Sequence, residues 1–198
     1  INGEWGSGKS FVLNMFEKQI KMHQSEKEAY DKYAVFHYNC WQYDYYDEPL
    51  IAIVAAMQDY VADEKSYGIS DEAKTKLAGT VKSITQNLVG AFSDQIKAKL
   101  GFDLVSIIQN GIDGFREGTE NWEENHSYDP YFHFKDTIRK IRESVAEFAN
   151  ERTIVFVVDE LDRCLPEYAI KVLERLHHVF DEIANVQVIL AIDKVQLE

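Results

Sequence analysis

The sequence G-E-W-G-S-G-K-S, from Gly3 to Ser10, decides the fold. It fits the pattern G-x-x-x-x-G-K-[ST], in which the backbone N–H groups of a loop surround phosphate oxygens. In this pattern Lys9 reaches the β- and γ-phosphates and the Ser10 hydroxyl binds Mg²⁺. The alternative is a glycine-rich turn in front of a helix. We predict that the nucleotide is bound by Gly3, Glu4, Trp5, Gly6, Ser7, Gly8, Lys9, Ser10 and Phe11.

The residues from Phe11 to Ile20 predict a helix that begins directly after this loop and points its positive end at the phosphates. A phosphate loop normally connects a strand to such a helix, yet only Ile1 and Asn2 precede Gly3. We therefore expect a strand to be missing before Ile1. We also expect further sequence, with room for one more sheet strand, after Glu198.

The composition predicts one domain with a packed core, because 45% of the 198 residues are hydrophobic and 28% are charged. The formal net charge of −13 argues against broad, nonspecific contact with nucleic acid or anionic lipid. Cys40 and Cys164 have no metal-ligand spacing, so reduced thiols in a cytoplasmic protein are expected. Segments outside this chain could still attach it to a membrane.

Three short stretches predict strands of an α/β fold. Residues 34–39 are the first, and the apolar runs Thr153–Val158 and Val186–Ile192 are typical of a parallel sheet buried on both faces. A helix that opens at Pro166 joins the last two strands as a right-handed crossover. Its buried stripe is predicted to consist of Ile170, Leu173, Leu176, Phe180 and Ile183.

The stretch between the first two of these strands predicts helices only. We expect one helix that begins at Pro49, a second near 71–100, a third near 104–115 and a fourth over about 132–148. An acidic loop is expected after the third helix. No part of it is apolar for 18 residues, so no transmembrane segment is expected. We predict residues 1–48 as the N-terminal part of a nucleotide-binding core, 49–150 as a large helical insertion, and 151–198 as the second part of the core.

A second motif follows the strand T-I-V-F-V-V, which ends in D-E-L-D-R-C. We expect Asp159 to hold Mg²⁺ directly or through a water, and Glu160 to polarise the attacking water as a general base. The alternative is an acidic turn after a strand. For Asp162 and Arg163 a salt bridge that braces the loop and a contact with nucleotide remain equally open.

Together the motifs resemble the KAP family of P-loop NTPases. The matching parts are G-E-W-G-S-G-K-S, then Y-N-C-W-Q-Y from Tyr38, then V-V-D-E-L-D-R-C from Val157, then V-I-L-A-I-D from Val188. Trp5 within the loop and the N-x-W of Asn39 and Trp41 are the most specific. Glu4 stands where the family usually has proline. Many members carry transmembrane helices in the insertion, so this chain resembles the soluble branch.

The resemblance implies an additional strand between the two motif strands, as in AAA+ and related ATPases, and Mg²⁺ with ATP as ligands. It also implies that Asp193 senses the γ-phosphate, although an aspartate that ends a strand and starts a turn is the alternative. We expect a homo-oligomer or a protein partner, because a further arginine for the γ-phosphate has to come from a neighbouring subunit or from beyond Glu198.

Three functions fit these observations: an ATPase that works as a switch or in assembly, a nucleotide-binding scaffold with little turnover, and a phosphotransferase. The adjacent Asp159 and Glu160 favour the ATPase, since kinases with this sheet need no water-activating glutamate beside the metal ligand. A role in defence against phage is suggested by the family alone.

Overall fold

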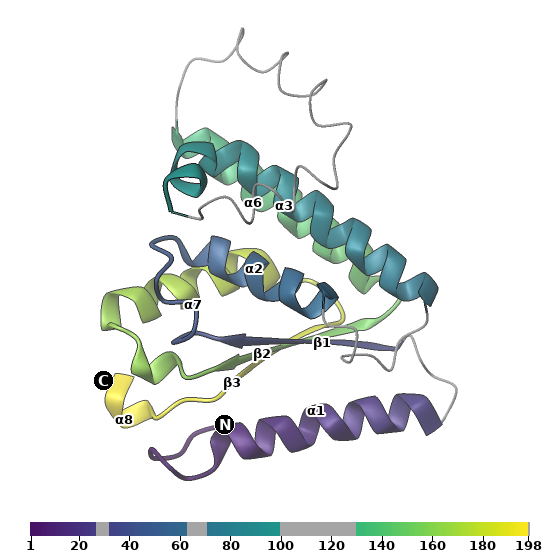
Figure 1. Cartoon of the computed structure of the whole chain (residues 1–198), viewed down its shortest axis with the longest axis vertical. Coiled ribbons are helices and arrows are strands. Elements are labelled where there is room, and N and C mark those ends of the chain that lie inside the picture. The colour runs from purple at the N-terminus through teal and green to yellow at the C-terminus, as the bar shows by residue number, and fades with distance from the viewer. Residues whose placement is uncertain (27–31, 63–70, 100–129, 198) are drawn as a thin grey trace, which may run out of the picture.

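The computed structural model describes residues 1–26, 32–62, 71–99 and 130–197, and it shows a parallel sheet covered by helices on both faces (Figure 1). In these residues the sheet has the strand order β1-β2-β3, formed by β1 (Tyr33–Asn39), β2 (Thr153–Asp159) and β3 (Val186–Leu190). All neighbouring strands are parallel. The three strands predicted from sequence are confirmed to within two residues.

The helices form layers above and below the sheet (Figure 1). Helix α1 (Lys9–Glu26) covers one face, while α2 (Pro49–Ala62) and α7 (Pro166–Phe180) cover the other. Helices α3 (Asp71–Lys99) and α6 (Pro130–Ala149) pack together on the outer side of α2 and α7. The helix predicted near 104–115 and the acidic loop after it lie outside the described residues, and the domain boundaries at 48 and 150 stay a prediction.

Strand β2 is the centre of the core because both of its faces are buried. Val155 and Val157 face α1, where they form one cluster with Leu13. Ile154 and Phe156 point to the opposite face and belong to the larger cluster beneath α2 and α7. Successive side chains of a strand point to opposite faces, so a strand buried on both faces has to be apolar throughout.

Helix α2 is buried along its first nine residues, from Pro49 to Met57. It lies between β1 and α3, and a helix that is apolar on all sides requires such a position. Its start is fixed by Glu48, whose Oε1 accepts the Leu50 N–H at 3.2 Å. The same carboxylate accepts two hydrogen bonds from Arg175 of α7, at 2.7 and 3.2 Å. The two helices on this face are thereby joined at one end.

The predicted apolar stripe of α7 is partly wrong. Ile170 is 59% exposed and Leu173 is 37% exposed, whereas Leu176 and Phe180 are buried as predicted. The stripe that packs on the core is shifted by one residue in its first two turns. Ala169 and Val172 have the same helical spacing as Ile170 and Leu173, so the packing against β2, not the spacing, decides which pair is inside. The buried residues are Ala169, Val172, Leu176, Val179 and Phe180.

The residues before the phosphate loop continue the sheet beyond β3. Asn2 forms a parallel bridge with Ile192, the Ile192 N–H donates to the Ile1 carbonyl at 3.0 Å, and the Gly3 N–H donates to the Ile192 carbonyl at 3.1 Å. Strand β3 therefore lies between β2 and the residues that lead into the loop, as the resemblance implies. None of the described helices has the length and apolar character needed to cross a bilayer.

His37 links β1 to α1 through a polar contact. Its Nδ1 lies 2.5 Å from Oε1 of Glu17. The hydrogen bond with Glu17 raises the pKa of His37 above its ordinary value of 6.5, burial opposes this, and the negative charges of Glu17 and Asp159 add to the rise. Because the pKa is higher in the folded than in the unfolded protein, the stabilisation is complete below about pH 6.5 and is lost as the pH rises through the folded value.

We therefore expect the free energy of unfolding to fall by about 1 kcal/mol as the pH rises from about 6 to about 8. Urea denaturation at a series of pH values measures this change. Glu17→Gln removes the partner and should flatten the profile, whereas His23→Asn, at an exposed position of α1, should leave it as in the wild type. A profile unaffected by Glu17→Gln would contradict the role of this pair.

Candidate functional site

The loop between Asn2 and α1 depends on its glycines. Gly6 and Gly8 have φ angles of 79° and 86°, a left-handed conformation that side chains disfavour. A Cβ atom on Gly3 would lie 2.6 Å from the Ser7 Oγ. The Ser7 N–H donates to the Glu4 carbonyl at 3.1 Å, and the first helical bond of α1 runs from the Val12 N–H to the Gly8 carbonyl at 3.0 Å. The loop thus delivers the chain directly into the N-terminus of α1.

Lys9 lies at the centre of this loop. Its Nζ donates to the Gly3 carbonyl at 2.7 Å and to the Glu4 carbonyl at 3.3 Å. It also lies 3.7 Å from Oδ2 of Asp162, and the Lys9 side chain is only 11% exposed. The ammonium group is therefore enclosed between the loop and the turn that follows β2.

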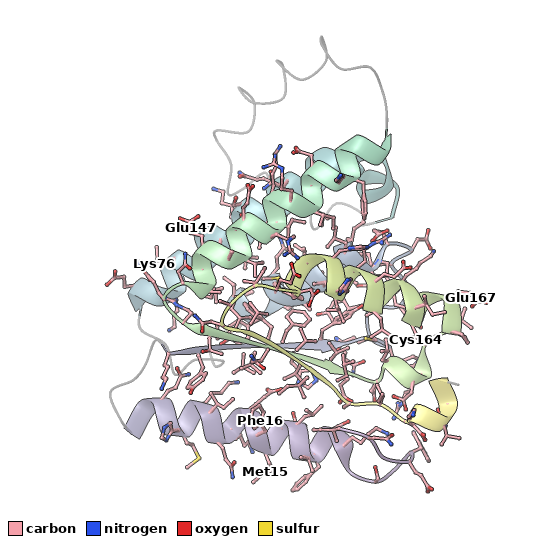
Figure 2. All side chains as sticks on the ribbon, turned by 180° about the vertical axis from the view of Figure 1, so that it is seen from behind. Met15, Phe16, Lys76, Glu147, Cys164 and Glu167 are labelled. Carbon is pink, nitrogen blue, oxygen red and sulfur yellow. The ribbon has the colours of Figure 1, made fainter. Side chains whose placement is uncertain are left out.

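Two strands contribute polar residues at the same edge of the sheet. Asn39 and Asp159 are paired at the carboxyl ends of β1 and β2. Asp159 is 3% exposed, and its Oδ1 accepts the Glu160 N–H at 2.9 Å. In open parallel sheets this edge is where ligands bind. Figure 2, in which Cys164 is labelled, shows the turn after β2 at the same end of the molecule as the loop before α1.

The side chain of Glu160 is held by two of its neighbours. Its Oε2 accepts a hydrogen bond from Nδ2 of Asn39 at 2.9 Å, and its Oε1 lies 3.0 Å from Nη2 of Arg163. The Arg163 guanidinium lies 5.5 Å from the centre of the Trp41 ring, within the range of a cation–π contact. The Glu160 backbone has φ 58° and ψ 26°, which costs about 1 kcal/mol for a residue with a side chain. The backbone strain therefore lies at Glu160, the residue predicted to act as the general base.

Asp162 lies in the short 3₁₀ helix η1 (Leu161–Arg163), whose Leu161 is fully buried. The Asp162 side chain is only 3% exposed. Its Oδ2 faces Lys9, whereas its Oδ1 is buried without a hydrogen-bond partner among the described residues. An unsatisfied buried oxygen costs about 1–3 kcal/mol, so this one needs an explanation.

The remaining predicted site residues differ in their surroundings. Ser10 is half-buried at the start of α1, whereas Trp5 and Phe11 are 72% and 69% exposed. Asp193 is 6% exposed, and its Oδ1 accepts the Val195 N–H at 3.2 Å at the start of α8 (Lys194–Leu197). Asp193 therefore ends a strand and begins a turn, and its contact with a γ-phosphate stays a prediction.

The structure brings four further residues to this site for which the sequence predicts no single role. Asn39 and Trp41 are family markers in the sequence, and for Asp162 and Arg163 a brace and a nucleotide contact are equally open. The usable signal was the position of Asn39 at the end of a predicted parallel strand, since such strand ends meet at one edge. In the segment after β1, Tyr43 and Tyr46 are buried in the core.

The oxygen atoms of the predicted site residues fit Mg²⁺ that arrives with a nucleotide. Mg²⁺ is usually bound by one or two carboxylates together with phosphate oxygens and waters. Ser10, Asp159 and the unpaired Asp162 Oδ1 offer such oxygens. Within the described ranges, no group of three or more His, Cys, Asp or Glu side chains could hold a metal by itself.

Comparison with known proteins gives one result. Residues 1–198 match the family described as the KAP family P-loop domain. No curated protein and no solved structure matches the chain.

The contact between Asn39 and Glu160 can be tested by stability. Asn39→Asp puts a carboxylate where an N–H now donates to Glu160, beside the buried Asp159. We expect a loss of about 1–2 kcal/mol at neutral pH. This loss should exceed that of Asn39→Ala, which removes the bond to Glu160 and the oxygen that accepts the Gln42 N–H at 3.0 Å but adds no charge. Thermal unfolding measures both. Gln42→Glu adds the same charge at an exposed position nearby and serves as control. Equal effects of Asn39→Asp and Asn39→Ala would contradict the contact between Asn39 and Glu160.

Proposed function

The chain belongs to the KAP family of P-loop domains, and we propose that it binds Mg²⁺–ATP, hydrolyses it, and works as a nucleotide-driven switch or assembly ATPase. The observation that carries this proposal is the position of Lys9. Its ammonium lies inside a loop with glycines in left-handed conformations, and it faces the turn that carries Asp162 and Glu160. This places a cation and acidic groups where the loop meets the carboxyl edge of the sheet.

Binding is assigned to the loop and its helix. The backbone N–H groups from Gly3 to Gly8 and the N-terminus of α1 attract phosphate oxygens. In the bound protein Lys9 exchanges its contacts with the Gly3 and Glu4 carbonyls for phosphate oxygens. Ser10 and Asp159 would hold Mg²⁺, which supplies positive charge at the β- and γ-phosphates.

Hydrolysis is assigned to Glu160 as the general base. A base needs a free carboxylate oxygen to accept the proton of the attacking water. In this structure one oxygen of Glu160 accepts from Asn39 and the other lies against Arg163. Glu160 therefore has to release one of these partners before it can act. The strained φ of 58° favours such a rearrangement, because movement of the turn relieves it.

The same contacts favour one competing function. With both oxygens of Glu160 engaged, the chain would bind nucleotide and turn it over slowly, as a scaffold does. Arg163 is occupied by Glu160, so we assign the second positive charge on the γ-phosphate to another protomer or to residues beyond Glu198. A cytoplasmic location and a role in phage defence rest on the composition and on the family, respectively.

Lys9→Ala should abolish ATP binding, because it removes the ammonium group that faces the phosphates. We expect the affinity to fall at least 100-fold, about 3 kcal/mol. Calorimetric titration with Mg²⁺–ATP measures it. Lys18→Ala removes the same charge from an exposed position of α1 and should bind as the wild type does. An unchanged affinity of Lys9→Ala would show that the loop is not the phosphate site.

Glu160→Gln should keep ATP binding and slow hydrolysis by roughly 10²–10⁴-fold, since it preserves the shape of the side chain and removes the base. Phosphate release by the full-length protein gives the rate, and calorimetry gives the affinity. Glu167→Gln, at an exposed position of α7, controls for the lost charge. Undiminished hydrolysis with intact binding would make Glu160 structural and favour the scaffold.

A further inference from the structure

Asp162 has a chemical environment that a structural salt bridge does not explain. Its side chain is 3% exposed, and Nζ of Lys9 lies 3.7 Å from its Oδ2. That separation is longer than a hydrogen bond. Lys9 has a closer acceptor in the Gly3 carbonyl, at 2.7 Å. As a structural salt bridge, the pair of Lys9 and Asp162 would therefore stabilise the loop only weakly.

The second oxygen of Asp162 points to a missing donor. Oδ1 is buried without a hydrogen-bond partner in the described part of the chain. Most buried polar atoms of folded proteins are satisfied, and an exception calls for a ligand, a water or an ion. A carboxylate cannot donate, so the absent group has to be a cation or a hydrogen-bond donor. Because Oδ2 of the same group faces Lys9, this donor lies beside the phosphate loop.

We propose that Asp162 is a third acidic residue of the nucleotide site, one that makes the site select nucleotide complexed with a divalent cation over free nucleotide. In the protein without ligand it is the counter-ion of Lys9. With ligand, Lys9 turns to the phosphates and Asp162 accepts a hydrogen bond from the water shell of Mg²⁺. This inference rests on the proposed function, because it assumes that phosphates bind at Lys9.

The selectivity follows from charge. Without Mg²⁺, a triphosphate must compete with Asp162 for Lys9 and must place its own negative charge next to a buried carboxylate. With Mg²⁺, the cation offsets both effects. Two unit charges 4 Å apart interact by about 4 kcal/mol at the effective dielectric constant near a protein surface. Even a fraction of this energy is sufficient for a tenfold difference in affinity.

The test compares ATP affinity in EDTA with ATP affinity in Mg²⁺, measured by calorimetry on the wild type and on Asp162→Asn. We expect Asp162→Asn to bind ATP roughly tenfold more tightly than the wild type in EDTA. In Asp162→Asn, the dissociation constant in EDTA divided by that in Mg²⁺ should be lower than in the wild type by at least the same factor. Glu147→Gln removes one charge at an exposed position of α6 and should leave the ratio unchanged.

A double variant shows whether Asp162 acts through Lys9. If Asp162→Asn strengthens binding in EDTA partly by freeing Lys9, the gain should be smaller in the Lys9→Ala background, where only the repulsion between Asp162 and the triphosphate remains. An equal gain with and without Lys9 would overturn the role of Asp162 as its counter-ion. Circular dichroism verifies the fold of each variant. Asp162→Ser is the second substitution, and it should lower the ratio in the same way.

The outcomes separate this inference from the proposed function. A wild-type chain that binds ATP in neither buffer overturns both. If the wild type binds Mg²⁺–ATP and Asp162→Asn has the same ratio of dissociation constants, EDTA over Mg²⁺, as the wild type, only the role of Asp162 is overturned. Loss of the folded state in both Asp162→Asn and Asp162→Ser would make the residue a structural brace and overturn the inference as well.

Discussion

Strand β1 pairs in parallel with β2 from Tyr33 opposite Thr153 to Asn39 opposite Asp159, and this register determines the geometry of the site. It places the Asn39 amide beside the turn of Glu160. On the other side of β2 lies β3, and two residues after its end Ile192 forms a bridge with Asn2, directly before the phosphate loop. A slip by one residue would turn each side chain to the opposite face. The buried faces of β2 exclude such a slip, because α1 covers one and α2 and α7 cover the other.

Both cations of the site are paired within the protein. Lys9 faces Asp162 and Arg163 lies against Glu160, so each of these cations has an acidic partner from the same turn. The overall charge of −13 repels a nucleotide at long range. The attraction for phosphate therefore depends on short-range groups, namely the loop N–H groups, the N-terminus of α1 and Lys9. A phosphate group that binds Lys9 separates it from Asp162. Binding at the phosphate loop therefore changes the interactions of the turn after β2.

Local patterns were sufficient for the elements and for part of the site. Strands buried on both faces are continuously apolar, and for that reason β2 could be predicted from the sequence. The run that contains β3 does form a strand, but the expectation that it is buried on both faces is wrong, because Gln187 and Val188 are exposed. The left-handed φ angles of Gly6 and Gly8 are local properties too, so the motif predicted the loop that the structure shows. Pro166 begins α7 as expected, because a proline needs no hydrogen-bond partner for its nitrogen at a first helical position.

The amino-acid sequence by itself thus determined the loop, the parallel sheet and the acidic strand end, since each depends on residues close together in the chain. Only the tertiary structure decided which face of the first two turns of α7 is inside, because Ala169 with Val172 and Ile170 with Leu173 are both pairs three residues apart that fit a stripe with Leu176. It alone joined Asn39 to Glu160, which are 121 residues apart. It also left one oxygen of Asp162 buried without a donor. The satisfaction of a buried polar atom depends on everything that packs around it, and no local pattern contains that information.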